Sequence, residues 1–462
     1  MSNDPSKTLP AVDAMREDWA IVDPLMGGTR AIRAAGAALL PKWPKEEKCE
    51  YEVRLKQSTL LPAYSETIKN NVGRVFAEPI ALGDDIPEPI KQLAENFDRQ
   101  GNNLHVWAQS FFTQALSHGL CHALVEYPQI LPAKPGAIVT NADAIAAKAR
   151  PYVIMIRPQQ IIGWRTSSKG GEHILTQLRY LESVEEDDGE FGVQTIDQIR
   201  VLTPGAWATY RKVKGDKDVE WLPHDQGISS LSTIALATLY TNRTGFMTAT
   251  PPLLELAHLN IKHWQSQSDQ DNILHVARVP MLAISGIDDS TWELKVGTAS
   301  ATKLPTGSTM QWVEHTGRAI EAGRTSLHDL LDEMRIAGAK LLQKDKQITK
   351  TATQAEDESA QEMSPLQAMA AQLEDTLDQI LQFFALFIGG AEGGHVQVNG
   401  NFDVDFAPTA TLPLLLNMAS QGRLSDETLF AEYQRRSIIS TDLKWADERA
   451  KISTQGPGLG VL

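Results

Sequence analysis

The sequence is short of cysteine and of long apolar runs. Its two cysteines, Cys49 and Cys121, are too few for a disulfide scaffold in a chain of 462 residues, and they favour a reducing compartment. No run approaches the ~18 consecutive apolar residues that a membrane-spanning helix needs. The first fifteen residues contain no apolar signal core. We therefore expect a globular protein without membrane contact.

Basic residues are outnumbered by acidic ones, 43 Lys and Arg against 58 Asp and Glu, so the formal net charge at pH 7 is -15. A surface that is acidic overall repels the phosphates of nucleic acids. Any contact with DNA is therefore expected to be local and weak. The hydrophobic content of 42% and the length are sufficient for two or three domains with real cores.

The common signatures of nucleotide-binding and acyl-transfer enzymes are absent. The sequence has no Gly-x4-Gly-Lys-Ser/Thr loop and no Gly-x-Ser-x-Gly elbow. The best candidate for chemistry is the pair His118 and His122, four residues apart on an expected helix over 104–124, with Cys121 between them. This spacing can hold zinc, but no second pair of ligands is evident. We favour structural histidines and keep a zinc-dependent hydrolase as the alternative.

The middle third of the chain has the most distinctive pattern. Thr250-Pro251-Pro252 predicts the start of a helix that continues to Ala277, with apolar residues at helical spacing in its first half. Residues 265–272 (QSQSDQDN) are polar on every face. This composition indicates a helix that bridges solvent or packs against copies of itself.

Short strands follow that helix, at 281–285, at 292–296 and around Met310 and Trp312. A second helix is expected to begin at Ser326, with a capping-box-like start. About 40 residues of short strands cannot build a sufficient core alone. We therefore expect this segment to lean on another chain.

The rest of the chain predicts a helix-rich α+β fold, because strand patterns between 123 and 240 follow one another without helices and indicate antiparallel pairing. A heptad repeat predicts a long packed helix over Ser364–Ile388, capped by Ser364 and closed by Gly389. The other expected elements are helices at 15–26, 29–40, 51–76, 90–97, 412–418 and 425–436, an acidic turn at 185–190 and a strand at 396–406.

A basic stretch follows the second helix of the middle third. It contains Lys340, Lys344, Lys346 and Lys350, together with Gln347. One interpretation is a solvated helix end, where lysines are favourable beside the C-terminal dipole. The other is a flexible loop that offers ammonium groups to phosphate, which a symmetric ring would turn into a circle of charges.

Several segments, taken in order, resemble the portal proteins of tailed double-stranded-DNA bacteriophages. The segments that carry the resemblance are Trp43–Arg54, Asn71–Pro79, Pro252–Ile261, Ser266–Asn272, Val313–Gly317, Gly338–Leu342, Thr351–Thr353 and Val398–Phe402. None of them is a catalytic motif, and only their joint order is specific. The resemblance extends from about Trp19 to about Trp445.

The resemblance implies a ring, usually of twelve subunits, at one vertex of the capsid in the virion, assembled in the host cytoplasm. DNA would pass through the ring during packaging and ejection, in weak and non-specific contact. The implied partners are other copies of the chain, the large terminase subunit, head-tail adaptors, and the major capsid and scaffolding proteins. No active site and no cofactor are implied. A head-completion or tail-adaptor protein is a further alternative, although those are usually shorter.

Carried over to this chain, the portal architecture has a wing, two stem helices that flank a clip, a tunnel loop and a crown. The corresponding ranges are 1–249 for the wing region, 250–278 for the first stem helix, 279–317 for the clip, 318–342 for the second stem helix, 343–363 for the tunnel loop region, 364–420 for the long helix and the return to the wing, and 421–462 for the crown and tail. The expected DNA-channel residues are Lys344, Lys346, Gln347 and Lys350. The expected contacts with the motor or adaptor are Trp292, Lys295, Lys303 and Trp312.

Overall fold

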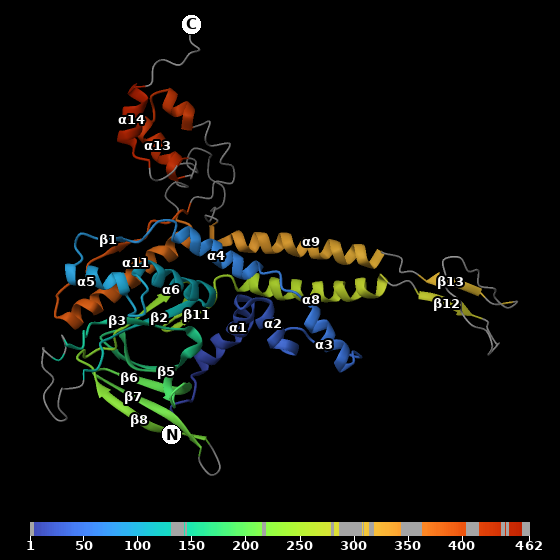
Figure 1. The fold of residues 1–462 in the computed structure, drawn as a ribbon, viewed down its shortest axis with the longest axis horizontal. Coiled ribbons are helices and arrows are strands. Elements are labelled where there is room, and N and C mark those ends of the chain that lie inside the picture. The colour runs from blue at the N-terminus through green and yellow to red at the C-terminus, as the bar shows by residue number, and fades with distance from the viewer. Residues whose placement is uncertain are drawn as a thin grey trace, which may run out of the picture. The chain divides into compact units, whose positions relative to one another are not determined.

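The computed structural model describes residues 4–130, 143, 146–214, 219–278, 281–285, 307, 309–313, 318–342, 363–402, 415–435, 439 and 443–454. The chain divides into two compact units, Met1–Phe402 and Asp403–Leu462. The first unit mixes helices with antiparallel strands (Figure 1). The predicted α+β class is therefore confirmed.

The helices of the first unit surround two apolar clusters. Its α-helices are α1 (Pro10–Met26), α2 (Gly28–Ala35), α3 (Lys48–Gln57), α4 (Ala63–Val75), α5 (Glu88–Leu93), α6 (Leu104–His118), α8 (Leu254–Ala277), α9 (Arg318–Ala339) and α11 (Pro365–Ile388). Its single 3-10 turns are η1 (Gly36–Ala38), η2 (Ala94–Asn96), η3 (Pro158–Gln160) and η4 (Lys340–Leu342).

All strand pairings among the described residues are antiparallel, as the sequence predicts. A three-stranded sheet has the order β3 (Tyr152–Ile156), β2 (Leu120–Glu126), β9 (Leu236–Tyr240). A five-stranded meander runs through β4 (Ile161–Lys169), β5 (Glu172–Asp188), β6 (Gly192–Thr203), β7 (Ala206–Lys214) and β8 (Val219–Ile228). Three two-stranded pairs are β1 (Ala81–Leu82) with β14 (Val396–Gln397), β10 (Arg243–Gly245) with β11 (Thr248–Ala249), and β12 (Met281–Ser285) with β13 (Thr309–Val313).

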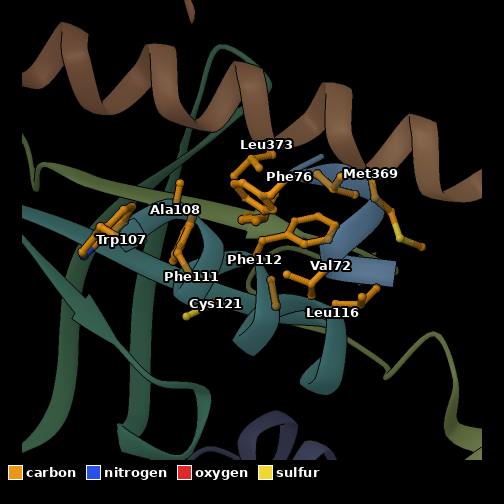
Figure 2. Packing of buried hydrophobic residues seen from close by; sticks show 14 of the residues in the cluster. Val72, Phe76, Trp107, Ala108, Phe111, Phe112, Leu116, Cys121, Met369 and Leu373 are labelled. Atoms are coloured by element: carbon orange, nitrogen blue, oxygen red, sulfur yellow. The ribbon is translucent and has the colours of Figure 1, made fainter. Parts of the chain in front are cut away.

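The larger apolar cluster lies where α6 packs against α4 and α11 (Figure 2). On α6 the rings of Trp107 and Phe111 stack with their centroids 4.8 Å apart. The heptad positions Leu366, Leu373 and Ile380 of α11 are fully buried, and each buried side chain of this size contributes ~1.5–3 kcal/mol of hydrophobic stabilisation. The predicted long helix is therefore confirmed as a core element.

Both predicted ends of α11 are confirmed. The Ser364 hydroxyl oxygen accepts a hydrogen bond from the Gln367 backbone N–H at 3.2 Å, as a helix cap does. At the other end Gly389 has φ 79°, a left-handed conformation that glycine adopts without the strain of a Cβ.

A second apolar cluster joins α1 to the sheets. Val12 and Trp19 of α1 are buried there with Leu120 of β2 and Tyr180 of β5. The Trp19 indole N–H donates to the backbone oxygen of His118 at 3.0 Å, so the buried ring has its polar atom satisfied. This contact fixes α1 against the point where α6 turns into β2.

Two expected helices are shorter than predicted. The helix expected over 51–76 is broken into α3 and α4, because the chain turns at residues 58–62, where the guanidinium of Arg33 donates to the Ser58 oxygen at 2.6 and 2.8 Å. The helix expected over 104–124 ends at His118. Gly119 has φ 94°, and a Cβ there would lie 2.5 Å from the Thr250 oxygen. Only glycine fits this turn, and β2 begins immediately after it.

Other boundaries also differ. The second helix of the middle third begins at Arg318 and not at Ser326, so the capping-like pattern at Ser326 lies inside the helix. Glu185–Asp188 continues β5, so the turn of the acidic segment is confined to 189–191. The sequence prediction omitted β8 and β9. Of the strand expected over 396–406, the described part has only Val396–Gln397 in β conformation.

The second unit contains α13 (Asp426–Arg435) and α14 (Trp445–Thr454). The Ser425 hydroxyl accepts from the Thr428 N–H at 3.1 Å, which confirms the predicted cap. The rings of Phe430 and Trp445 lie 5.4 Å apart and pack the two helices together. Residues 415–420 are also helical, close to the expected helix over 412–418.

Candidate functional site

The middle third forms a helix, a strand pair and a second helix. The chain runs out along α8, passes through β12 and β13, and returns along α9, which lies beside α8 (Figure 1). The two strands pair in register from Met281 opposite Val313 to Ser285 opposite Thr309. We take this helix–hairpin–helix segment, residues 254–342, as the candidate functional site.

The first half of α8 is anchored in the core of its own chain. Leu256, Ala257 and Trp264 are at most 1% exposed. Asn260 is fully buried, and its side-chain oxygen accepts from the Tyr64 N–H at 3.0 Å while its amide donates to the Leu61 oxygen at 2.9 Å. The paired helices therefore project from a fixed base formed with α4.

The polar half of α8 is less exposed than its composition predicts. Gln265 donates to the Leu39 oxygen at 2.6 Å, and Gln270 donates to the Ile320 oxygen at 3.0 Å on α9. Ser268 is 3% exposed. The expectation that residues 265–272 meet only solvent or other copies is therefore wrong for Gln265 and Gln270, because backbone oxygens of the same chain accept their hydrogen bonds, and for Ser268, because it is buried within its own chain.

By contrast, α9 is buried on one side only. Leu330 and Met334 are 3% exposed and face the rest of the first unit, whereas Ile336 is 68% exposed. Polar and charged residues cover most of the remaining surface, including an ion pair of Arg335 with Asp332 at 2.9 Å. This face of α9 is therefore open to solvent in the single chain.

Of the residues predicted to contact the motor or adaptor, the structure describes one. Trp312 lies on β13 with its Cα opposite that of Leu282. Trp292, Lys295 and Lys303 lie outside the described residues. The four predicted channel residues Lys344, Lys346, Gln347 and Lys350 also lie outside them. The preceding lysine, Lys340, is exposed on η4 at the end of α9.

A groove of about 940 Å³ runs between α3 and the second half of α8. At its wall Arg54 forms an ion pair with Glu46, with Nε 2.6 Å from a carboxylate oxygen, and its guanidinium lies 4.1 Å from the centre of the Trp43 ring. The hydrogen bond from Arg54 is the main reason that the pKa of the Glu46 carboxyl is below its ordinary value. No sequence pattern indicated this pair, although Glu46 and Arg54 both lie within Trp43–Arg54, a segment that carries the portal resemblance.

The two histidines of the hydrolase alternative do not share a helix. His118 ends α6, and His122 lies on β2, with its Nδ1 2.9 Å from the hydroxyl of Thr238. Burial lowers the pKa of His122 to about 3. In the part of the chain that the structure describes, no three His, Cys, Asp or Glu side chains are grouped to hold a metal. The helical premise of the His118–His122 site is therefore wrong.

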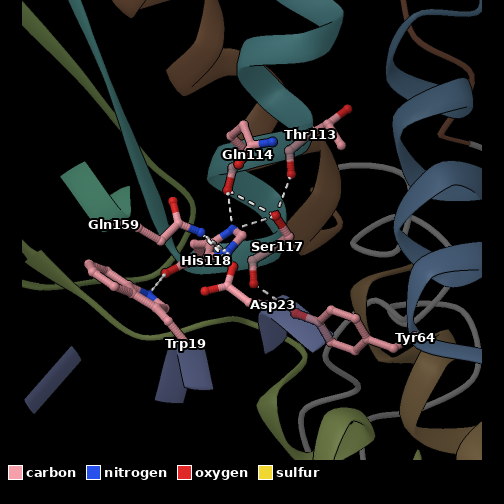
Figure 3. A network of polar contacts seen from close by, with 8 residues as sticks. All are labelled: Trp19, Asp23, Tyr64, Thr113, Gln114, Ser117, His118 and Gln159. Atoms are coloured by element: carbon pink, nitrogen blue, oxygen red, sulfur yellow. Dashed lines mark hydrogen bonds and ion pairs between the residues drawn. The ribbon is translucent and has the colours of Figure 1, made fainter. Parts of the chain in front are cut away.

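His118 instead joins a polar network between α1, α6 and η3 (Figure 3). Its Nε2 lies 2.8 Å from an Asp23 carboxylate oxygen, and its Nδ1 lies 2.7 Å from the Ser117 hydroxyl. The arrangement has the residue types of a serine-hydrolase triad. However, Ser117 is fully buried, and its hydroxyl also lies 2.8 Å from the Thr113 carbonyl oxygen, so it is not presented to a substrate.

No protein of curated function matches the sequence. A family model described as a domain of unknown function (DUF4055) matches residues 252–388, from just before α8 to the end of α11. Within the described residues, no helix combines the length and apolar character needed to cross a membrane.

Three solved structures that resemble the chain come from gene transfer agent (GTA) particles. The neck of an empty particle, computed with C6 symmetry, is 11% identical with a TM-score of 0.40, over 92% of this chain and 100% of that chain. The virion of a native particle is 11% identical with a TM-score of 0.38, over 86% and 91%. The neck of a native particle, computed with C12 symmetry, is 12% identical with a TM-score of 0.35, over 82% and 89%. Similarity at this level leaves the family of the chain open.

Proposed function

We propose that the chain is a portal protein, a subunit of a ring that conducts DNA into and out of a phage capsid. The sequence resemblance supports this proposal, and the order of elements agrees with it: a helix anchored in the core, a strand pair, and a returning helix. In the proposed assignment α8 and α9 are the stem helices, and the segment that contains β12 and β13 is the clip.

The observation that carries the proposal is the one-sided burial of α9. On its inner face Leu330 and Met334 are buried, whereas Ile336 on the other side is 68% exposed. A two-stranded pair such as β12–β13 is marginal in water without further packing. A closed ring with head-to-tail contacts would cover both surfaces with the same neighbouring chain.

In this proposal the ring is a passive conduit. The net charge of -15 per chain weakens the attraction of the bore for DNA, so the duplex slides and is not held. Energy for packaging would come from the terminase, and the clip would bind first that motor and later the head-tail adaptors. The wing region would face the capsid and scaffolding proteins.

Negative-stain electron microscopy of the purified chain, with light scattering on the same sample, tests the proposal. We expect end-on views of closed rings with a central hole. A matched pair of variants locates the contact: Ile336→Asp on α9 should abolish rings while the fold is retained, and Val213→Asp, at a 47% exposed site on β7, should leave them intact. A chain that stays monomeric at high concentration would contradict the proposal.

A further inference from the structure

Three polar side chains from different elements meet on the wall of a polar pocket of about 510 Å³. Asp23 comes from α1, His118 from α6 and Gln159 from η3 (Figure 3). The His118 Nε2 lies 2.8 Å from the Asp23 oxygen, the Gln159 side-chain nitrogen lies 2.5 Å from the same oxygen, and the two nitrogens are 2.7 Å apart. The three atoms form a nearly equilateral triangle.

With the Gln159 nitrogen at the junction and Asp23 ionised, protons alone do not satisfy this triangle. The two N–H bonds of an amide diverge by about 120°, so Gln159 cannot point one at each of two atoms that lie so close together. If His118 Nε2 accepts from Gln159, two lone pairs face each other across the contact with Asp23. If Nε2 is protonated and donates to Asp23, the two nitrogens of His118 and Gln159 are both donors, and no hydrogen bond joins them across their 2.7 Å contact. Each assignment leaves one short contact without a hydrogen bond.

A cation above the triangle removes the conflict once the Gln159 amide is turned so that its oxygen lies at the junction, because all three corners then present lone pairs to it. We propose that Asp23, His118 and Gln159 form a binding site for a divalent first-row cation, of which Mn²⁺ and Zn²⁺ are the representatives to test. A cation ~2.1 Å from each corner would see them at roughly 80° from one another, close to the right angles of octahedral coordination. The open side faces the pocket, where water would complete the shell. The pocket is also lined by Gln114, Arg157 and Gln160.

The surroundings of His118 have the features of a metal ligand. Metal-binding histidines usually donate their second ring N–H to a carbonyl or a similar acceptor, which orients the ring. The Nδ1 of His118 lies 2.7 Å from the Ser117 hydroxyl and 3.2 Å from the Gln114 carbonyl oxygen. With the side chain only 3% exposed, the ring is held with Nε2 toward Asp23.

Gln159 supplies the third ligand through its oxygen. That oxygen is buried without a hydrogen-bond partner when the nitrogen occupies the junction. The oxygen and nitrogen of an amide are assigned from their hydrogen bonds. Rotation of the amide by half a turn brings the oxygen to the junction, where one imidazole nitrogen and two oxygens suit Mn²⁺ or Zn²⁺. The site uses neither His122 nor any residue of the helix–hairpin–helix segment, although α1 packs against α8.

The test is a titration of the full-length chain with Mn²⁺, with free Mn²⁺ followed by electron paramagnetic resonance. We expect one Mn²⁺ per chain, displaced by Zn²⁺. Asp23→Asn should weaken binding at least ten-fold. The matched control is His395→Gln, which removes an exposed histidine that lies 2.6 Å from the Asp85 carboxylate and is not part of the proposed site. It should bind Mn²⁺ as the unmodified chain does.

Gln159→Glu distinguishes a metal site from a cluster of Asp23, His118 and Gln159 that is held by hydrogen bonds alone. A second carboxylate tightens a cation site, so Mn²⁺ affinity should rise at least ten-fold. In a hydrogen-bonded cluster without metal, the same change puts a like charge beside Asp23 and only lowers the melting temperature. Less than one Mn²⁺ per chain at saturation, or equal affinity before and after Asp23→Asn, would overturn the proposal. Ring formation, measured on the same samples, reports separately on the proposed function.

Discussion

Arg54 and Glu46 form an ion pair that is almost completely removed from water, with side chains 5% and 3% exposed. The guanidinium also donates to the Pro41 oxygen at 2.9 Å and lies over the Trp43 ring. An ion pair of this kind is costly to break, because removal of one charge leaves the other buried and unpaired. It holds the last turn of α3 against the segment that precedes the helix.

Arg54→Ala should therefore lower the free energy of unfolding by about 3–5 kcal/mol, measured by urea denaturation. Lys48→Ala is the matched control on the same helix. Lys48 lies 3.9 Å from Glu52, but the two side chains are 87% and 63% exposed, and exposed pairs contribute only about 0–1 kcal/mol. Equal effects of the two substitutions would show that the buried pair does not stabilise the fold.

The burial of His122 predicts a pH dependence. Its pKa falls from an ordinary 6.5 to about 3 in the folded chain, so the unfolded chain binds the proton more readily between these values. Stability should therefore decrease as the pH falls below about 6.5, with a contribution that approaches 1.4 kcal/mol per pH unit. Urea denaturation between pH 7 and pH 5 measures this slope.

The slope should be shallower in His122→Gln by that amount, whereas His395→Gln should not reduce it in the same way. His395 is exposed, and its hydrogen bond with Asp85 raises its pKa, which is the opposite direction. A slope that is identical in the unmodified chain and in His122→Gln would contradict the assignment.

At the scale of elements, helices and strands with a strong period in the sequence were predicted correctly. The heptads of α11, the apolar run of β3 and the paired strands β12 and β13 are local signals, and the structure confirms them. The ends of α6 and α3 depend on contacts with distant residues. Gly119 is packed against Thr250, and the Ser58 oxygen is held by Arg33. Local signals were present at both breaks, a glycine directly after α6 and Pro62 directly before α4, but the apolar spacing that continues across them predicted unbroken helices.

The helix–hairpin–helix segment was likewise predictable in its local elements but not in its contacts. The order of helix, strands and helix is readable from the sequence, and Trp312 does lie on a paired strand. The polar half of α8 was misread because its composition does not show that Gln265 and Gln270 reach backbone oxygens of the same chain. The cluster of Asp23, His118 and Gln159 has no sequence signal, since the fold alone brings these distant residues together.

At the scale of the whole molecule, the acidity of the chain and its basic stretch have opposite effects on DNA. The proposed ring, built of chains that each carry a charge of -15, would repel the duplex. The lysines at 344, 346 and 350 would then be the local exception, repeated once per subunit around the bore. Phosphate contacts of this kind are independent of base sequence and weaken as salt rises.

The variant with Lys344→Ala, Lys346→Ala and Lys350→Ala should therefore assemble normally but package or retain less DNA, because the ring loses its phosphate contacts and keeps its subunit contacts. The measurement is the fraction of DNA-filled particles, counted by electron microscopy beside a ring assay. Lys340→Ala is the control, since this lysine is fixed at the end of α9 and precedes the proposed loop. Unchanged packaging in the triple variant would remove these lysines from the mechanism and leave the solvated helix end as the better interpretation of the basic stretch.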